Sequence, residues 1–162
     1  MKLYIGIDPG LDGALVATSD KAAYFWDTPS LLVGTKRQPD VAAMSRILDQ
    51  EVEGASGIGR PGWRVAIEAV HSMPKQGVAS SFAFGFGYGV WFGLLTALGI
   101  SFETVSPQRW KKSLMDGMPR EKDSSRQRAM QLFPKTAEDL KLKKHHGRAD
   151  ALLIAEWRRR TG

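Results

Sequence analysis

The sequence predicts an α/β fold, a mixed five-stranded sheet flanked by helices, in a single domain that covers residues 1–162. Three short apolar runs near the N-terminus are separated by turn-forming residues, a pattern typical of an antiparallel meander. Two further strand-like runs, 64–68 and 101–105, alternate with segments of helical length. A chain of 162 residues suits one compact domain.

The N-terminal half begins with three predicted strands, which are residues 2–7, 13–18 and 22–27. Residues 28–39 contain two prolines and a glycine, and we expect them to form a loop. Residues 40–52 have apolar side chains at the spacing of an amphipathic helix, namely Val41, Met44, Ile47 and Leu48. The glycine-rich segment 53–62 is expected to be a surface loop.

The C-terminal half contains two predicted strands and four predicted helices. The strands are residues 64–68 and 101–105. The helices are residues 79–98, 108–114, 124–133 and 146–160. A charged segment, residues 115–123, is expected to be a mobile loop between the second and third of these helices.

Composition narrows the functional classes. The net charge of +6 and the pI near 9.7 are a weak argument for a polyanionic partner. The sequence has no cysteine, which excludes disulfides, thiolate metal sites and a cysteine nucleophile. The N-terminus does not resemble a signal peptide, since its apolar part is short and Asp8 interrupts it. We therefore expect a cytoplasmic protein.

Residues 76–102 contain no charged side chain, so their length alone would suit a transmembrane helix. Six glycines and two adjacent strand-like runs argue against a membrane span. We expect instead a helix that is buried in the protein or in an oligomer. Small residues recur every fourth position, at Gly85, Gly89, Gly93 and Ala97. Such a stripe permits close approach, either to the sheet or to a second subunit.

Three acidic residues occupy positions where an isolated carboxylate is costly to bury. Asp8 ends the first predicted strand, Glu68 ends the fourth, and Asp150 lies near the start of the last helix. Each has an ordinary alternative explanation, as a turn former, an exposed strand end or a helix-dipole partner. The three together indicate a site for hard cations such as Mg²⁺, which prefers oxygen ligands.

Three motifs resemble the active-site motifs of the RuvC family of Holliday junction resolvases, in particular its phage-type branch. They are IGIDPGLDGALV (5–16), VAIEAV (65–70) and HHGRADALLIAEW (145–157). The segment SPQRWKKSL (106–114) resembles the basic segment that this family has after the fifth strand. The order of elements also matches the RNase H-like superfamily. The resemblance covers nearly the whole chain, and the combination of motifs is more specific than any one alone.

The resemblance implies a metal-dependent crossover junction endodeoxyribonuclease, a hydrolase of DNA recombination and repair that cleaves Holliday and other branched DNA junctions. It implies a homodimer, and a cytoplasmic location in a bacterial or phage-infected cell. Two Mg²⁺ ions are expected in each active site, with Mn²⁺ as a substitute. Asp8, Glu68 and Asp150 match the family's metal-binding and catalytic carboxylates.

The chain departs from the family pattern at the fourth polar ligand, which most members place three or four residues before the last acid. Gly147 occupies the first of these positions and His146 the second. Residues four apart share a helix face, so His146 is expected to reach the same metal or its water. The alternatives are that His145 completes the site, or that His146 only begins the helix.

Basic and apolar residues near the acids are expected to contact DNA. They are His71, Met73, Lys75, Arg109, Lys111, Lys112, Arg120 and Lys122, with Arg126 and Arg128 extending the basic surface. Lys111 and Lys122 resemble the family's phosphate-contacting lysines, although a charge run is usually only a solvated face. Gly85, Gly89 and Gly93 are expected at the dimer interface, because RuvC-type dimers place this helix there.

Two other functions compete with this interpretation. Actin-like ATPases and sugar kinases also begin with an IGID-Gly strand and turn, but they need two such domains around the nucleotide. A nuclease-dead DNA-binding module would bind DNA without a magnesium-dependent cut. That alternative is hard to reconcile with three intact acids.

Overall fold

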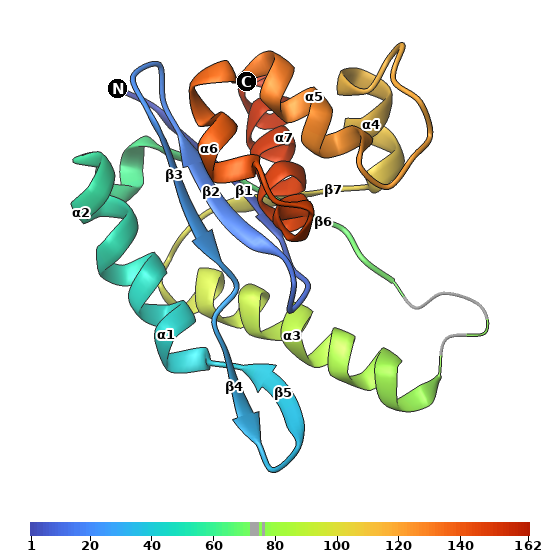
Figure 1. Ribbon diagram of the computed structural model, residues 1–162. Coiled ribbons are helices and arrows are strands. Elements are labelled where there is room, and N and C mark those ends of the chain that lie inside the picture. The colour runs from blue at the N-terminus through green and yellow to red at the C-terminus, as the bar shows by residue number, and fades with distance from the viewer. Residues whose placement is uncertain (72–74, 76) are drawn as a thin grey trace.

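The structure is a computed structural model that describes residues 1–71, 75 and 77–162, and a five-stranded mixed sheet forms its centre (Figure 1). The strands are β1 (Leu3–Asp8), β2 (Ala14–Thr18), β3 (Ala23–Asp27), β6 (Trp63–Glu68) and β7 (Phe102–Val105). Their order across the sheet is β3-β2-β1-β6-β7. The first three pair antiparallel, as the predicted meander requires, while β1–β6 and β6–β7 pair in parallel. The predicted fold class is confirmed.

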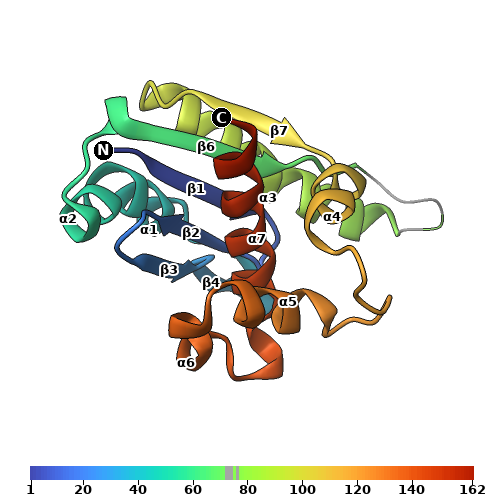
Figure 2. The same ribbon diagram turned by 90° about the horizontal axis from the view of Figure 1, so that it is seen from above.

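Helices cover both faces of the sheet, and the alternation of side chains along each strand separates two cores. Leu3, Ile5 and Ile7 of β1 belong to the core with α1 (Val41–Arg46) and α3 (Val78–Ala97). The other face lies under α7 (His146–Thr161), which crosses β1 and β2 (Figure 2). Three further helices pack against α7, namely α4 (Pro107–Leu114), α5 (Ser124–Leu132) and α6 (Ala137–Leu140).

The packing of α7 on β1 requires a glycine at position 6. A Cβ on Gly6 would lie 2.0 Å from the carbonyl oxygen of Ala151 and 2.4 Å from the amide nitrogen of Ala155. Both atoms belong to the backbone of α7, so only a displacement of the helix would make room. Gly6 therefore sets the distance between α7 and the sheet, and with it the position of Asp150.

The helical region after β5 is longer than predicted. α1 continues into a π-helical segment, Ile47–Glu51, and then into α2 (Val52–Ser56), which ends at Gly57 in the left-handed conformation. The predicted loop 53–62 is wrong over its first part, and a 3₁₀ turn, Arg60–Gly62, occupies its end. The additional turn, residues 53–56, ends where the N–H of Gly57 donates to the carbonyl oxygen of Glu53 at 2.8 Å.

The predicted loop 28–39 is also wrong, because it contains a two-stranded hairpin. Its strands are β4 (Ser30–Val33) and β5 (Lys36–Pro39), joined across Gly34, whose φ is 64°. All of β4 is exposed, so the strand has no apolar–polar alternation that a sequence could show. Arg37 ties the hairpin to the β1–β2 turn by bonds to Asp12 Oδ1 (2.8 Å) and Leu11 O (2.9 Å).

The long uncharged helix is confirmed as α3, and of the two expected ways to bury it, the described chain itself covers only a small part. Its buried residues are Gly87, Trp91 and Leu95, whereas the Phe82 side chain is 76% exposed. A Cβ on Gly85, Gly89 or Gly93 would meet no atom within 4 Å, so the small-residue stripe does not pack on the sheet. By length and composition alone α3 would also suit a membrane, and one such helix is weak evidence for that.

The remaining predicted elements agree with the structure within a few residues. Helices α4, α5 and α7 lie where the sequence predicts them, and the loop between α4 and α5 is present. The sequence did not indicate α6 or the short 3₁₀ turns on either side of it, Pro134–Thr136 and Lys143–His145.

Candidate active site

Asp8 and Glu68 end adjacent parallel strands at the same edge of the sheet. The register pairs Ile7 with Ile67, so these two acids are the next residues of β1 and β6. Alternation along the strands places both acids on the face of Gly6 and Ala66, beneath α7. The Asp8 carboxylate accepts a hydrogen bond from the backbone N–H of Gly10 at 3.4 Å, which orients it within the β1–β2 turn.

Asp150 lies on the second turn of α7, the helix that covers the sheet face with Asp8 and Glu68. Its Oδ1 is buried and has no hydrogen-bond partner among the residues that the structure describes. A buried carboxylate oxygen without a partner is costly, so this atom is suited to a bound cation. Burial raises the pKa of Asp150. A hydrogen bond with the hydroxyl of Ser125, on α5, opposes this effect but does not outweigh it.

The three carboxylates lie close enough to repel one another. Burial, and then the charges of Asp150 and Glu68, raise the pKa of Asp8 to about 7. Burial and the nearby Asp150 also raise the pKa of Glu68. The positive charge of Lys111 opposes these effects and lowers the pKa of all three acids. A second source of positive charge would relieve the remaining repulsion.

The donor set fits a divalent cation. Three carboxylates supply the hard oxygen ligands that Mg²⁺ prefers, and one of their oxygens is buried and without a partner in the described chain. Within residues 1–71, 75 and 77–162, however, no three His, Asp or Glu side chains are gathered tightly enough to form a ready-made ion site. Carboxylates that no cation neutralises repel one another, so we expect these three to lie farther apart than they would around a bound ion.

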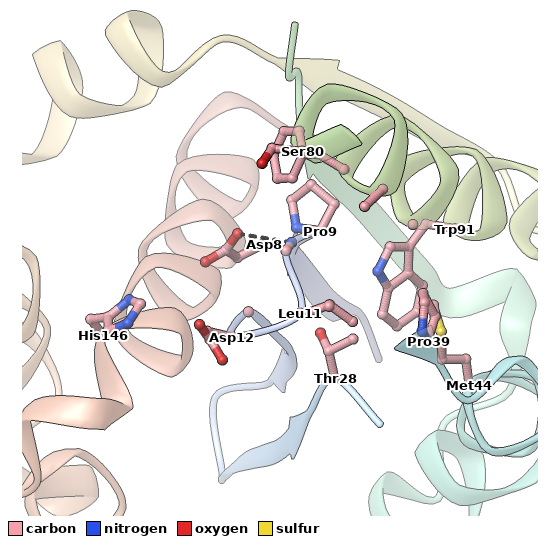
Figure 3. Close-up of a pocket in the computed structure, with 15 residues that line it drawn as sticks. Asp8, Pro9, Leu11, Asp12, Thr28, Pro39, Met44, Ser80, Trp91 and His146 are labelled. Atoms are coloured by element: carbon pink, nitrogen blue, oxygen red, sulfur yellow. Dashed lines mark hydrogen bonds between the residues drawn. The ribbon is translucent and has the colours of Figure 1, made fainter. Parts of the chain in front are cut away.

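His146 begins α7 and lies on the same side as Asp8, where both residues line one cavity (Figure 3). Its charge also acts on Asp150 and lowers the pKa of that acid. His145 is buried instead, and its Nδ1 accepts a hydrogen bond from the N–H of Leu142 at 3.4 Å. The geometry favours His146 over His145 as the histidine of this site.

Gly147 explains why this sequence departs from the acidic pattern at the three-residue spacing. A Cβ on Gly147 would lie 2.1 Å from the carbonyl oxygen of Asp12. The start of α7 therefore touches the backbone of the β1–β2 turn, and no side chain fits at this position without moving one of the two. The next position toward the N-terminus, His146, is where this chain can place a polar side chain.

Lys111, Lys112, Arg120 and Lys122 line one hollow between α4 and the loop that follows it. Ser125, the neighbour of Asp150, lies at the edge of the same hollow. The predicted phosphate-contacting residues of this region therefore do come together, next to the acids.

Other basic residues of the predicted surface have structural roles. Arg126 binds both carboxylate oxygens of Asp123 at 2.7 Å and also donates to the carbonyl oxygens of Leu140 and Lys141. Arg128 donates to the carbonyl oxygen of Leu114 at 2.7 Å, and the guanidinium carbon of Arg109 lies 5.3 Å from the centre of the Trp157 ring. These contacts hold Arg126 and Arg128 within the protein, and their part in the DNA surface stays a prediction.

The segment between β6 and α3 contains three of the residues that are expected to contact DNA. His71 and Lys75 are both exposed, and Lys75 has a φ of 68°, which is rare for a residue other than glycine. Met73, the apolar member of this group, lies outside the described residues. The role of this segment stays a prediction.

Sequence reasoning missed three contacts around the acids. The indole N–H of Trp110 donates to Glu68 Oε2 at 2.7 Å, Ser125 lies beside Asp150, and Arg37 holds the turn that follows Asp8. Trp110 lies within the basic family-like segment 106–114, but nothing in its spacing indicates a carboxylate partner 42 residues away. Such contacts depend on tertiary packing.

Part of the chain is similar in sequence to a known protein. No protein-family model matches the chain. A stretch of 91 residues, or 56% of the chain, is 38% identical to the Holliday junction resolvase MOC1 of the chloroplast of Chlamydomonas reinhardtii. The chain spans only about a tenth of the length of that relative.

Solved structures match over nearly the whole chain. The structure of Thermus thermophilus RuvC in complex with a Holliday junction substrate superposes with a TM-score of 0.59 over 99% of this chain and 96% of that one, at 16% identity. The chain has the RuvC fold. A second Thermus thermophilus RuvC structure gives a TM-score of 0.56 with the same coverage at 20% identity. The RNase H-like architecture expected from the sequence is thereby confirmed.

Proposed function

We propose that this protein is a divalent-metal-dependent endonuclease that cleaves four-way and other branched DNA junctions. The observation that carries the proposal is the convergence of Asp8, Glu68 and Asp150 from β1, β6 and α7 on one face of a RuvC fold. The local identity to a Holliday junction resolvase supports the same activity. An enzyme of this kind would act on DNA in the cytoplasm of a bacterial or phage-infected cell.

Asp8, Glu68 and Asp150, together with His146, would hold two Mg²⁺ ions, for which Mn²⁺ would substitute. Bound ions of this kind supply an activated water and stabilise the leaving oxygen of a phosphodiester. The protein itself contributes the fixed positions of these ligands, because strand ends and the base of α7 carry them. The unpartnered oxygen of Asp150 and the raised pKa of Asp8 support this assignment within the described chain.

Lys111, Lys112, Arg120 and Lys122 would hold the DNA backbone against this site. They line one hollow that borders the acids, and Lys111 already acts electrostatically on all three carboxylates. Contacts of this type position a backbone without reading its sequence. His71 and Lys75 are exposed beyond Glu68 and would lie closer to the branch point.

The proposed function is tested with a labelled four-way junction and a linear duplex of matching sequence, each incubated with and without Mg²⁺. We expect symmetric nicks in the junction only when Mg²⁺ is present, and little cutting of the duplex. Junction binding without any cut in Mg²⁺ or Mn²⁺ would instead indicate a DNA-binding module that lacks nuclease activity. Nucleotide binding without junction binding would indicate the kinase-like alternative.

A series at His146 tests the fourth ligand. We expect His146→Ala to lose about 10- to 100-fold in cleavage rate, and His146→Asp to retain substantial activity with Mg²⁺, because an acid restores an oxygen ligand. Cleavage rates of the three proteins in Mg²⁺ and in Mn²⁺ measure this. Full activity of His146→Ala throughout would show that His146 only begins α7.

We also propose that the protein is a homodimer through the exposed side of α3. Gly85, Gly89 and Gly93 face open space and permit close approach, while the exposed Phe82 and Phe86 offer apolar contact area. We expect Gly89→Leu to fold normally, because a Cβ there meets nothing within 4 Å of its own chain, but to run as a monomer. Light scattering at micromolar concentration distinguishes the two states. A monomeric wild type would contradict the proposed dimer.

A further inference from the structure

The indole of Trp110 makes a direct contact with one of the proposed metal ligands. Its N–H donates to Glu68 Oε2 at 2.7 Å, across 42 residues of sequence. Trp110 is completely buried, so its N–H has no access to solvent as an alternative partner. A hydrogen bond to a carboxylate is among the stronger ones in proteins, because the acceptor is charged.

The position of Trp110 is set by the core and not by Glu68. α4 begins after Ser106, whose hydroxyl accepts a hydrogen bond from the N–H of Arg109 at 3.3 Å. The Trp110 ring then packs in the core cluster that lies under α7. The strand ends beside it are also fixed, since the N–H of Ala69 donates to the carbonyl oxygen of Val105 at 2.7 Å. The indole N–H of Trp110 is therefore held rigidly, whereas the Glu68 side chain that accepts its hydrogen bond is more flexible.

We infer that Trp110 is a positioning residue, which fixes the carboxylate of Glu68 in the orientation that binds the divalent cation. This inference rests on the proposed function. The terminal torsion of a glutamate is broad and roughly two-fold, so a free carboxylate samples many orientations. The indole N–H selects one of them by holding Oε2. Partners of this type, which hold a metal ligand from behind, typically contribute 10- to 100-fold to metal affinity.

The chain contains a matched pair for comparison. The indole N–H of Trp26 donates to Glu51 Oε2 at 3.0 Å, so it has the same donor and acceptor as the Trp110 pair. Trp26 lies on β3 and Glu51 ends the π-helical segment after α1, on the other face of the sheet from α7. A substitution of Trp26 therefore controls for the loss of an indole–carboxylate bond in general.

The first test observes the indole directly, by nuclear magnetic resonance of protein labelled with ¹⁵N-tryptophan. Trp110→Phe and Trp26→Phe each remove one indole signal and so assign both. We expect Glu68→Gln to shift the Trp110 signal and leave the Trp26 signal in place. Titration with MgCl₂ should likewise move the Trp110 signal and leave Trp26 unaffected.

The second test measures Mn²⁺ affinity by calorimetry in the absence of DNA. We expect Trp110→Phe, which preserves most of the ring volume, to bind Mn²⁺ about 10-fold more weakly than the wild type. Trp26→Phe should bind like the wild type. Thermal unfolding of each variant shows whether it is folded, and the Glu68→Gln spectrum tests the contact even where Trp110→Phe is not.

The outcomes separate this inference from the proposed function. A Trp110 signal that ignores both Glu68→Gln and Mg²⁺, in a protein that does cut junctions, would overturn the inference and leave the function intact. Wild-type Mn²⁺ affinity in a folded Trp110→Phe protein would overturn it equally. A Trp110 signal that responds to Mg²⁺ in a protein that cuts no junction would support the inference and contradict the proposed nuclease.

Discussion

Asp8→Asn is expected to abolish junction cleavage while junction binding stays intact or becomes tighter. The substitution removes one ligand of the proposed cations, whose contribution of several kcal/mol corresponds to about three orders of magnitude in rate. It also removes a negative charge that repels the phosphate backbone. Cleavage assays in Mg²⁺ and binding assays without metal measure the two effects. Undiminished cutting by pure Asp8→Asn protein would disprove the assignment of this acid.

The same variant is expected to be more stable than the metal-free wild type at neutral and alkaline pH. In the folded protein the pKa of Asp8 is raised from 3.8 to about 7, chiefly by burial, so ionisation of Asp8 costs the folded state more than the unfolded one. The wild type therefore loses stability as the pH rises from about 4 to about 7, and the asparagine, which cannot ionise, does not.

The advantage of Asp8→Asn should thus be largest above pH 7 and absent near pH 4. Allowing for rearrangement of the neighbouring acids, we expect roughly 2 kcal/mol, or about 5 °C in Tm, at pH 8. Mg²⁺ should stabilise the wild type and narrow the difference. Thermal unfolding of both proteins at pH 4 and pH 8, with and without Mg²⁺, tests this. An equal Tm in metal-free buffer at pH 8 would show that Asp8 is not electrostatically strained.

Gly6→Ala is expected to destabilise the protein strongly, because the new methyl group collides with the backbone of α7. The new Cβ would lie 2.0 Å from the carbonyl oxygen of Ala151, and both close neighbours are backbone atoms of α7. No side-chain rearrangement relieves this contact, so α7 must move away from the sheet and carry Asp150 and His146 with it. We expect a loss of roughly 3 kcal/mol or more, about 10 °C in Tm, and a loss of cleavage beyond the loss of stability.

Gly54→Ala is the matched control for this prediction. Gly54 lies in α2, and a Cβ there meets no atom within 4 Å. The same chemical change should therefore stabilise the protein slightly, by about 0.5–1 kcal/mol, because alanine is the better helix former. Thermal unfolding measures both variants. A Gly6→Ala protein with the stability and cleavage rate of the wild type would mean that α7 does not pack on β1 as closely as the structure shows.

The sequence by itself predicted the strands of the sheet and the helices that cover it. Their signals are local, since short apolar runs and helical spacing do not depend on distant residues. The hairpin β4–β5 was not predicted because all of β4 and most of β5 are exposed, and alternation appears only where one face is buried. The extension of the first helical region past Val52 was not predicted, because none of residues 53–56 is buried and they add no apolar periodicity.

For α3 as well, the sequence predicted the helix but not its surroundings. Its uncharged sequence correctly predicted a long helix, but composition cannot say what covers an apolar surface. The structure shows that the sheet covers Trp91 and Leu95 and leaves Gly85, Gly89 and Gly93 open. Of the two expected ways to bury this helix, the chain itself provides little, and the open stripe supports the proposal of a second subunit.

For the candidate site, the sequence determined which acids to consider, because Asp8 and Glu68 directly follow apolar runs and Asp150 directly precedes the apolar run 151–155. Only the tertiary structure decided how they meet. The register of β1 and β6 aligns two of them, and Gly6 and Gly147 let α7 approach the backbone closely enough to add the third and His146. Trp110, Ser125 and Lys111 act on these acids across long stretches of chain. Such contacts are set by the packing of distant elements, which a local sequence pattern does not contain.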